Sequence, residues 1–155
     1  MNPSGVLAST EKKEQWEGLF AVAKEKGFQE YRPHIFHKEP KWFRFISDGF
    51  SKFLDREDIQ YFMASFREDH LLHTLLPKNK SAMWLIWGAH DTIVPAAWSQ
   101  DWMRLNPKTR SIIINDSGHS PHVETPLLTV QLILKILNGK TVKDGSGYRF
   151  AIAQS

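Results

Sequence analysis

Two short apolar runs, each closed by turn residues, dominate the pattern of the chain. Met83 to Trp87 is apolar throughout and ends at a glycine, and Ile112 to Ile114 is β-branched throughout and ends at the turn residues Asn115 to Gly118. Runs of this kind are typical of strands that are buried on both faces. Between them, Pro95 can open a helix that ends near Asn106. The order strand, helix, strand predicts a parallel βαβ unit with a right-handed crossover.

The part of the chain before these strands has a helical and aromatic pattern. An amphipathic helix is expected to end at Gly27. Residues 28–40 are expected to form a loop, because they contain two prolines and their mixed polarity has no helical period. Aromatic residues then recur at helical spacing from Trp42 to Phe53, and Asp55 can cap a further helix.

After the second strand, a helix is expected to start at Pro126 and to end at Gly139. Its predicted inward residues are Leu127, Val130, Leu134 and Leu137. Residues 140–155 are expected to form a tail, with a turn at Asp144 to Gly147 and a short strand within Tyr148 to Ala153.

Composition narrows the functional classes. The chain has 155 residues, of which 41% are hydrophobic and 12% aromatic, which suffices for one domain with a substantial core. The net charge of +3 is small and no Lys/Arg run occurs, so we expect no nucleic-acid partner. The absence of cysteine excludes disulfides and a thiol nucleophile. Since the sequence has neither a signal region at Met1 to Gly5 nor an apolar stretch of transmembrane length, we expect a cytoplasmic protein with no membrane contact.

Asp91 and His119 are the candidate catalytic residues. Each follows the carboxyl end of one predicted strand, and parallel neighbouring strands place these loops side by side at the edge where open α/β sheets hold their active sites. A carboxylate beside an imidazole fixes the tautomer of the ring and stabilises its protonated form. The pair amounts to two thirds of a nucleophilic triad.

Plainer interpretations exist for these and the neighbouring residues. Asp91 can cap the helix that Pro95 opens. Asp116 and Glu124 lie near the same edge and are substitute candidates for the acid, although capping and backbone contacts suit them better. Three His-x-x-His pairs could place rings on one helix face for a metal, but no adjoining glutamate motif accompanies them, so chance surface histidines are the preferred interpretation. These pairs are His34/His37, His70/His73 and His119/His122.

The residues around the candidate pair resemble the C-terminal part of the α/β-hydrolase family. In that family an apolar strand leads into Gly-x-x-Asp-x-x-Val-Pro, followed by a helix, a second strand, Gly-His-Ser-Pro with a later Glu and Pro, and a last helix. The same order is found here in Gly88 to Pro95 and in Gly118 to Pro121. The resemblance implies that Asp91 is the triad acid and His119 the general base, and it implies no cofactor and no metal.

The same resemblance implies an α/β fold class and a division of the chain. It implies a partial α/β-hydrolase fold in which a helical cap segment at residues 6–79 precedes a C-terminal βαβα unit with parallel strands at residues 80–139. Residues 140–155 remain as the tail.

The nucleophile of the family has no counterpart in the sequence. The family carries it in Gly-x-Ser-x-Gly on a strand-to-helix turn before the acid, and the nearest sequence here, Gly49 to Phe53, has only one glycine. No aspartate replaces it, and the strands that would carry this turn and the oxyanion hole are absent. The resemblance therefore implies the C-terminal portion of a hydrolase for ester, amide or related bonds, expected to be inactive alone, whose complete form acts on a small molecule.

Two further hypotheses stay open. The chain could be a non-catalytic binding or regulatory protein on a partial hydrolase scaffold, or one subunit of a two-chain hydrolase. Because a strand that is apolar on both faces needs helices on each side and pairing along its edge, we expect self-association or a second chain that completes the sheet.

Overall fold

The computed structural model describes residues 28–54, 56–58, 72–140, 142 and 145–148, with single positions at 12, 14, 15, 18, 21 and 61. Its elements in chain order are α2 (Phe28–Ile35), η1 (Lys41–Phe45), α3 (Ser47–Leu54), η3 (Leu72–Thr74), η4 (Leu76–Lys78), β1 (Met83–Gly88), η5 (Ala96–Trp98), α5 (Ser99–Leu105), β2 (Thr109–Ile114), α6 (Pro121–Glu124), α7 (Pro126–Leu137) and β3 (Gly145–Tyr148). The helices predicted before Gly27 and after Asp55 fall largely outside the described residues.

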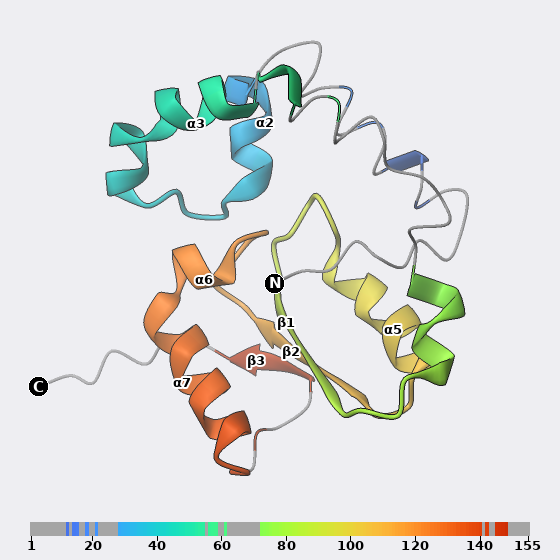
Figure 1. Cartoon of the computed structure of the whole chain (residues 1–155). Coiled ribbons are helices and arrows are strands. Elements are labelled where there is room, and N and C mark those ends of the chain that lie inside the picture. The colour runs from blue at the N-terminus through green and yellow to red at the C-terminus, as the bar shows by residue number, and fades with distance from the viewer. Residues whose placement is uncertain are drawn as a thin grey trace, which may run out of the picture.

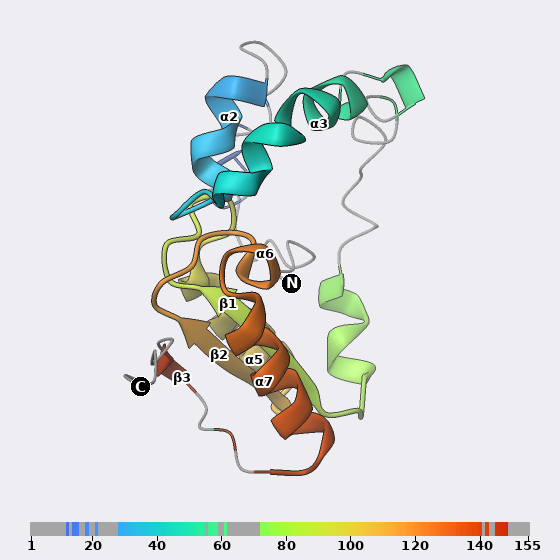
Figure 2. The same ribbon diagram turned by 90° about the vertical axis from the view of Figure 1, so that its left-hand side faces the viewer.

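The three strands form one parallel sheet in the order β1-β2-β3. β1 and β2 pair from Met83 opposite Thr109 to Gly88 opposite Ile114, so both strands end at the same edge. Helix α7 lies on one face of the sheet and α5 on the other (Figures 1 and 2). The predicted parallel strands and the helix between them are confirmed, and helices cover both faces as expected for strands without a polar side.

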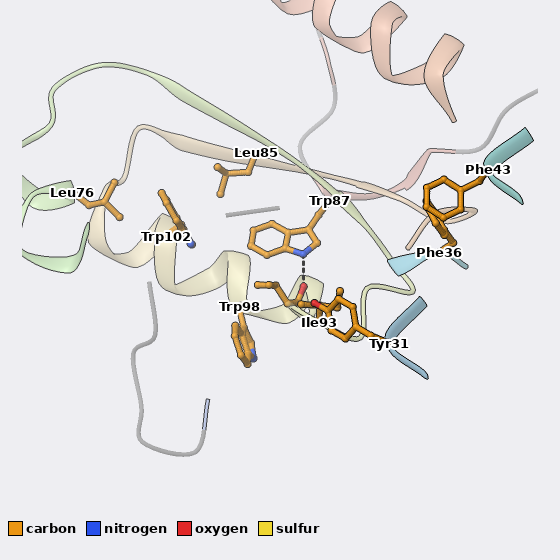
Figure 3. Close-up of a cluster of buried hydrophobic side chains, with 10 residues drawn as sticks. Tyr31, Phe36, Phe43, Leu76, Leu85, Trp87, Ile93, Trp98 and Trp102 are labelled. Carbon is orange, nitrogen blue, oxygen red and sulfur yellow. Dashed lines mark hydrogen bonds between the residues drawn. The ribbon is translucent and has the colours of Figure 1, made fainter. Parts of the chain in front are cut away.

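Alternate residues of the strands enter two separate apolar clusters. On the α5 side, Trp87 is completely buried in a cluster that includes Tyr31, Phe36, Phe43, Leu76, Leu85, Trp98 and Trp102 (Figure 3). On the α7 side, Ile86 packs with Ile112, Ile114, Leu128 and Leu132. This division follows the two-residue period of a strand and explains why β1 is apolar throughout.

Residues 28–35 form helix α2 where a loop was predicted. The prediction rested on Pro33, which lies in the last turn of this helix and therefore interrupts little of it. Burial stabilises the segment instead: Tyr31 and Phe36 are 9% and 8% exposed, and the Phe36 ring meets the edge of Phe43 at a centroid distance of 4.8 Å. Tertiary packing outweighs the local signal here.

Helix α7 begins where it was predicted but buries the opposite face. Leu128, Thr129 and Leu132 are its buried residues. The residues predicted to point inward are exposed instead, namely Leu127, Val130, Leu134 and Leu137. The helix is apolar nearly all round, so its periodicity could not identify the buried face. α7 therefore presents an apolar face to solvent.

The two outer strands of the sheet differ in their surroundings. β3 occupies Gly145–Tyr148, where a turn was predicted, because pairing with β2 overrides the low strand propensity of glycine. At the other side, β1 pairs with β2 and with no other strand in the described part of the chain. Among the described residues no strand therefore covers the outer edge of β1, although its residues from Leu85 to Gly88 are buried.

Candidate active site

Asp91 lies in the loop that follows β1, and its side chain is completely buried. Its Oδ1 accepts hydrogen bonds from the backbone N–H groups of Ile93 and Val94, both at 2.9 Å. Trp87 braces the same loop by donating its Nε1–H to the Val94 carbonyl at 2.6 Å, the dashed line in Figure 3. An aspartate that accepts backbone N–H groups two and three residues ahead closes a tight local turn. The loop sequence itself therefore fixes the position of this carboxylate.

His119 lies in the loop that follows β2, and its ring meets Asp91. The distances from Nδ1 to Oδ2 and Oδ1 are 3.0 Å and 3.2 Å, so the predicted contact is present. A carboxylate only accepts hydrogen bonds, so Nδ1–H donates and the lone pair of the neutral ring is on Nε2. The His119 side chain is 29% exposed while that of Asp91 is not exposed at all. The ring is therefore accessible from the surface, whereas the carboxylate behind it is not.

A glycine allows two loops to approach each other: the loop after β1 that carries Asp91, called the acid loop, and the loop after β2 that carries His119, called the base loop. A Cβ atom at Gly88 would lie 2.6 Å from the carbonyl carbon of Ser117 and closer still to the carbonyl oxygens of Ser117 and Gly118. The same approach lets the His90 N–H donate to the Ser117 carbonyl at 2.9 Å. The strand end at Gly88 thus has no room for any side chain if Asp91 and His119 are to meet.

Residues 28–38, which comprise α2 and the three residues after it and are called the α2 segment below, add a third side to the site through two histidines. His34 Nδ1 lies 3.1 Å from Thr92 Oγ1, and the ring of His37 stacks on that of His90 with centroids 3.7 Å apart. The preferred interpretation of this His-x-x-His pair was chance surface residues, and the structure gives both rings partners in the acid loop. In the sequence, the only signal at these two residues is their His-x-x-His spacing, which does not indicate contact with the acid loop.

Glu124 joins the α2 segment to the base loop. Its Oε1 accepts hydrogen bonds from Gly118 N–H at 2.7 Å and from the Ser117 hydroxyl at 3.2 Å. Its Oε2 accepts from the N–H groups of His37 and Lys38, at 2.7 Å and 3.0 Å. The backbone role preferred for this residue is therefore the observed one, but its extent was not foreseen.

Three other residues near the candidate motifs have different surroundings. Asp116 is 43% exposed, with Lys38 Nζ 3.8 Å away, so it does not replace Asp91. Ser51, the centre of the nearest match to the nucleophile motif, lies within α3 and not on a strand-to-helix turn. Ser120 lies at the start of α6, where its carbonyl accepts N–H groups from residues 123 and 124.

Two titrating groups near the pair are perturbed. Burial raises the pKa of Tyr31 to about 12, and the negative charge of Asp91 contributes in the same direction. This phenol is therefore uncharged at physiological pH. Partial burial lowers the pKa of His122, and the neighbouring His119 adds to this effect.

Within the described ranges, no three His, Asp or Glu side chains converge so as to hold a metal ion. Among the helices that can be described, none is both long enough and apolar enough to cross a bilayer.

Solved structures provide the comparison for this arrangement. A provisionally assigned lipase from Acinetobacter baumannii matches 88% of this chain with 17% identity and a TM-score of 0.62, over 50% of its own length. A provisionally assigned aryl esterase from Burkholderia cenocepacia matches 89% with 22% identity and a TM-score of 0.58, over 46% of its length. An α/β-hydrolase from a deep-sea metagenome library of the Medee basin matches 91% with 21% identity and a TM-score of 0.54, over 56% of its length.

Comparison with protein-family models gives no match, and comparison with curated proteins gives none either. The chain spans about half the length of the solved structures that it matches. All three matches cover most of this chain, from 88% to 91% of its residues. This chain has a partial α/β-hydrolase fold.

Proposed function

We propose that this chain supplies the acid and the base of a hydrolase for ester, amide or related bonds, and that the nucleophile comes from polypeptide outside these 155 residues. The observation that carries the proposal is the contact between His119 Nδ1 and the buried carboxylate of Asp91, at the shared carboxyl edge of two parallel strands. The lipase and aryl esterase assignments of two similar structures make esters the first substrate class to test.

In this mechanism His119 moves the proton. Its Nε2 takes the proton from the nucleophile's hydroxyl as the oxygen attacks the substrate carbonyl, and the ring becomes positively charged. Asp91 stabilises that charge through Nδ1–H and keeps the ring in the required tautomer. His119 then donates the proton to the leaving group as its bond to the carbonyl carbon breaks. In the second step the ring takes a proton from the water that releases the acyl group from the nucleophile. General acid–base catalysis of this kind contributes roughly 10²- to 10⁴-fold to the rate.

The sequence and the exposed surfaces support a nucleophile from elsewhere. No Gly-x-Ser-x-Gly occurs in the chain. The outer edge of β1, the apolar face of α7 and Phe45, which is 90% exposed, are surfaces of the kind that contact further polypeptide. We therefore place the missing strands beside β1 and assign α2 and α3 to a cap over the site.

The test compares the isolated chain with the complete natural protein or complex that contains it, purified from its own cells through a tag on this chain. Both are assayed with a p-nitrophenyl ester of a short acid. The variant is His119→Ala, and the matched control is His73→Ala in η3, an element that precedes β1 in the chain. We expect turnover only by the complete form, a loss of roughly 10⁴-fold or more in His119→Ala, and unchanged turnover in His73→Ala.

Full activity of the complete form with His119→Ala would refute the proposal. Turnover by the isolated chain that depends on His119 would refute the external nucleophile, and Ser51 and Ser120 would then be the first residues to replace. A complete form that binds partners but hydrolyses no ester or amide would favour a binding or regulatory protein.

A further inference from the structure

The carboxylate of Glu124 divides its two oxygens between segments that are far apart in the sequence. Oε1 binds the base loop through Gly118 and Ser117, and Oε2 binds the α2 segment through the backbone of His37 and Lys38. Hydrogen bonds to an ionised acceptor are roughly twice as strong as neutral ones. One side chain therefore holds two segments together, and each segment uses its own oxygen.

The two segments also touch directly at the residue before the catalytic base. A Cβ atom at Gly118 would lie 2.7 Å from the His37 nitrogen and 3.1 Å from the Phe36 carbonyl carbon, so this contact leaves no room for a side chain. The next residue, His119, donates its backbone N–H to the Ile35 carbonyl at 3.0 Å. The backbone on both sides of the Gly118–His119 peptide is therefore fixed by the junction with residues 35–38.

The ring of His119 can reach Asp91 only while its backbone stays in this place. Asp91 is held separately, by the turn of its own loop, and its carboxylate is completely buried. A shift of the base loop would therefore move the ring relative to a carboxylate that its own turn still holds. The loss of the α2 segment from the junction would allow such a shift, since it would remove the backbone packed against Gly118 and the Ile35 carbonyl that accepts the His119 N–H.

We propose that Glu124 is a positioning residue, which couples the docking of residues 35–38 to the orientation of the His119 ring toward Asp91. The catalytic meaning of this coupling rests on the proposed function, whereas the coupling itself is a property of the chain alone. Motion of residues 35–38 would reach the base through this carboxylate as well as through the direct backbone contacts, so an arriving or departing ligand that moves this segment would also change the alignment of the base.

The substitution that tests the coupling is Glu124→Gln. Glutamine has the shape of glutamate, but its NH₂ group cannot accept a hydrogen bond, so one of the two segments must lose its acceptor in either orientation of the amide. The matched control is Glu30→Gln, which changes an exposed glutamate on α2 in the same way. Ser117→Ala is a milder second variant, because it removes only the 3.2 Å hydrogen bond to Oε1.

The measurement is proton exchange with water, followed by NMR in the whole 155-residue chain. Two signals are compared: the Nδ1 proton of His119, and the backbone amides of His37 and Lys38. In Glu124→Gln we expect both to exchange roughly tenfold faster, and in Ser117→Ala roughly twofold to fivefold faster, with Glu30→Gln unchanged. Amides in the centres of β1 and β2 should keep their rates in all three variants.

Faster exchange of the His37 and Lys38 amides with no change at His119 would overturn the proposal, since Glu124 would then hold the segment without positioning the base. Equal acceleration throughout β1 and β2 would also overturn it, because that pattern means a general loss of stability. If Glu124→Gln does not fold, the graded response of Ser117→Ala decides between the same outcomes. The measurement needs no turnover, so its failure would leave the hydrolase proposal standing.

Discussion

The sharpest structural prediction concerns Gly88, the last residue of β1. In Gly88→Ala the new methyl group would overlap the backbone of residues 117 and 118, which cannot move aside without shifting the base loop. Overpacking costs about 1–3 kcal/mol, and contact with rigid backbone places this case at the upper end. Loss of the hydrogen bond from His90 N–H to Ser117 adds about 1 kcal/mol. The lower entropy of the unfolded alanine chain offsets about 0.4–1 kcal/mol.

The net expectation is a loss of about 3 kcal/mol in the free energy of unfolding, measured by urea denaturation of the chain. Gly49→Ala is the matched control. Nothing lies within 4 Å of a Cβ atom built at Gly49, and this residue is inside helix α3, so the same change should stabilise the chain by about 0.5–1 kcal/mol. A loss below about 1 kcal/mol for Gly88→Ala would mean that the two loops do not approach as described.

Three other substitutions test the site and the packing. In the complete protein, Asp91→Asn should lower turnover by up to roughly 10⁴-fold, because the amide would hold the His119 ring in the wrong tautomer; full activity would point to another carboxylate. Leu132→Ala, at a position 1% exposed, should cost about 2–5 kcal/mol of unfolding free energy, whereas Leu137→Ala, 76% exposed, should change it by no more than about 0.5 kcal/mol; equal costs would contradict the assigned face of α7. In an ultraviolet titration of the three tyrosines, one ionisation step should occur near pH 12, and this step should be absent in Tyr31→Phe. Since its folded-state pKa is raised above 10.0, the stability that Tyr31 contributes is present below pH 10 and is lost as the pH rises toward 12; ionisation of Tyr31 near pH 10 in the folded chain would contradict this.

The sequence was most informative where one local signal had a single physical solution. The apolar run from Met83 to Trp87 can be covered only from both sides, and two parallel strands must end at one edge, so the contact of Asp91 with His119 could be predicted from the spacing alone. The crossover helix was likewise bounded by Pro95 and Asn106, which lie where the structure begins η5 and ends α5.

The predictions failed where distant residues decide the outcome. Pro33 suggested a loop, but burial of Tyr31 and Phe36 outweighs the lost backbone hydrogen bond. The two faces of α7 are almost equally apolar, and its orientation depends on the sheet beneath it, which the periodicity does not describe. The links that Glu124 makes depend on residues 86 and 87 positions away in the sequence, and no local pattern contains them.

The measurement that tests the central claim most directly is the tautomer of the neutral His119 ring, read from nitrogen NMR of the intact chain. The account predicts that the proton lies on Nδ1, donated to Asp91, with the lone pair on Nε2 facing the place of the nucleophile. In Asp91→Asn the asparagine NH₂ should donate to Nδ1 instead, and the proton should move to Nε2. A ring that carries its proton on Nε2 in the unchanged chain, or the same tautomer in both proteins, would contradict the account.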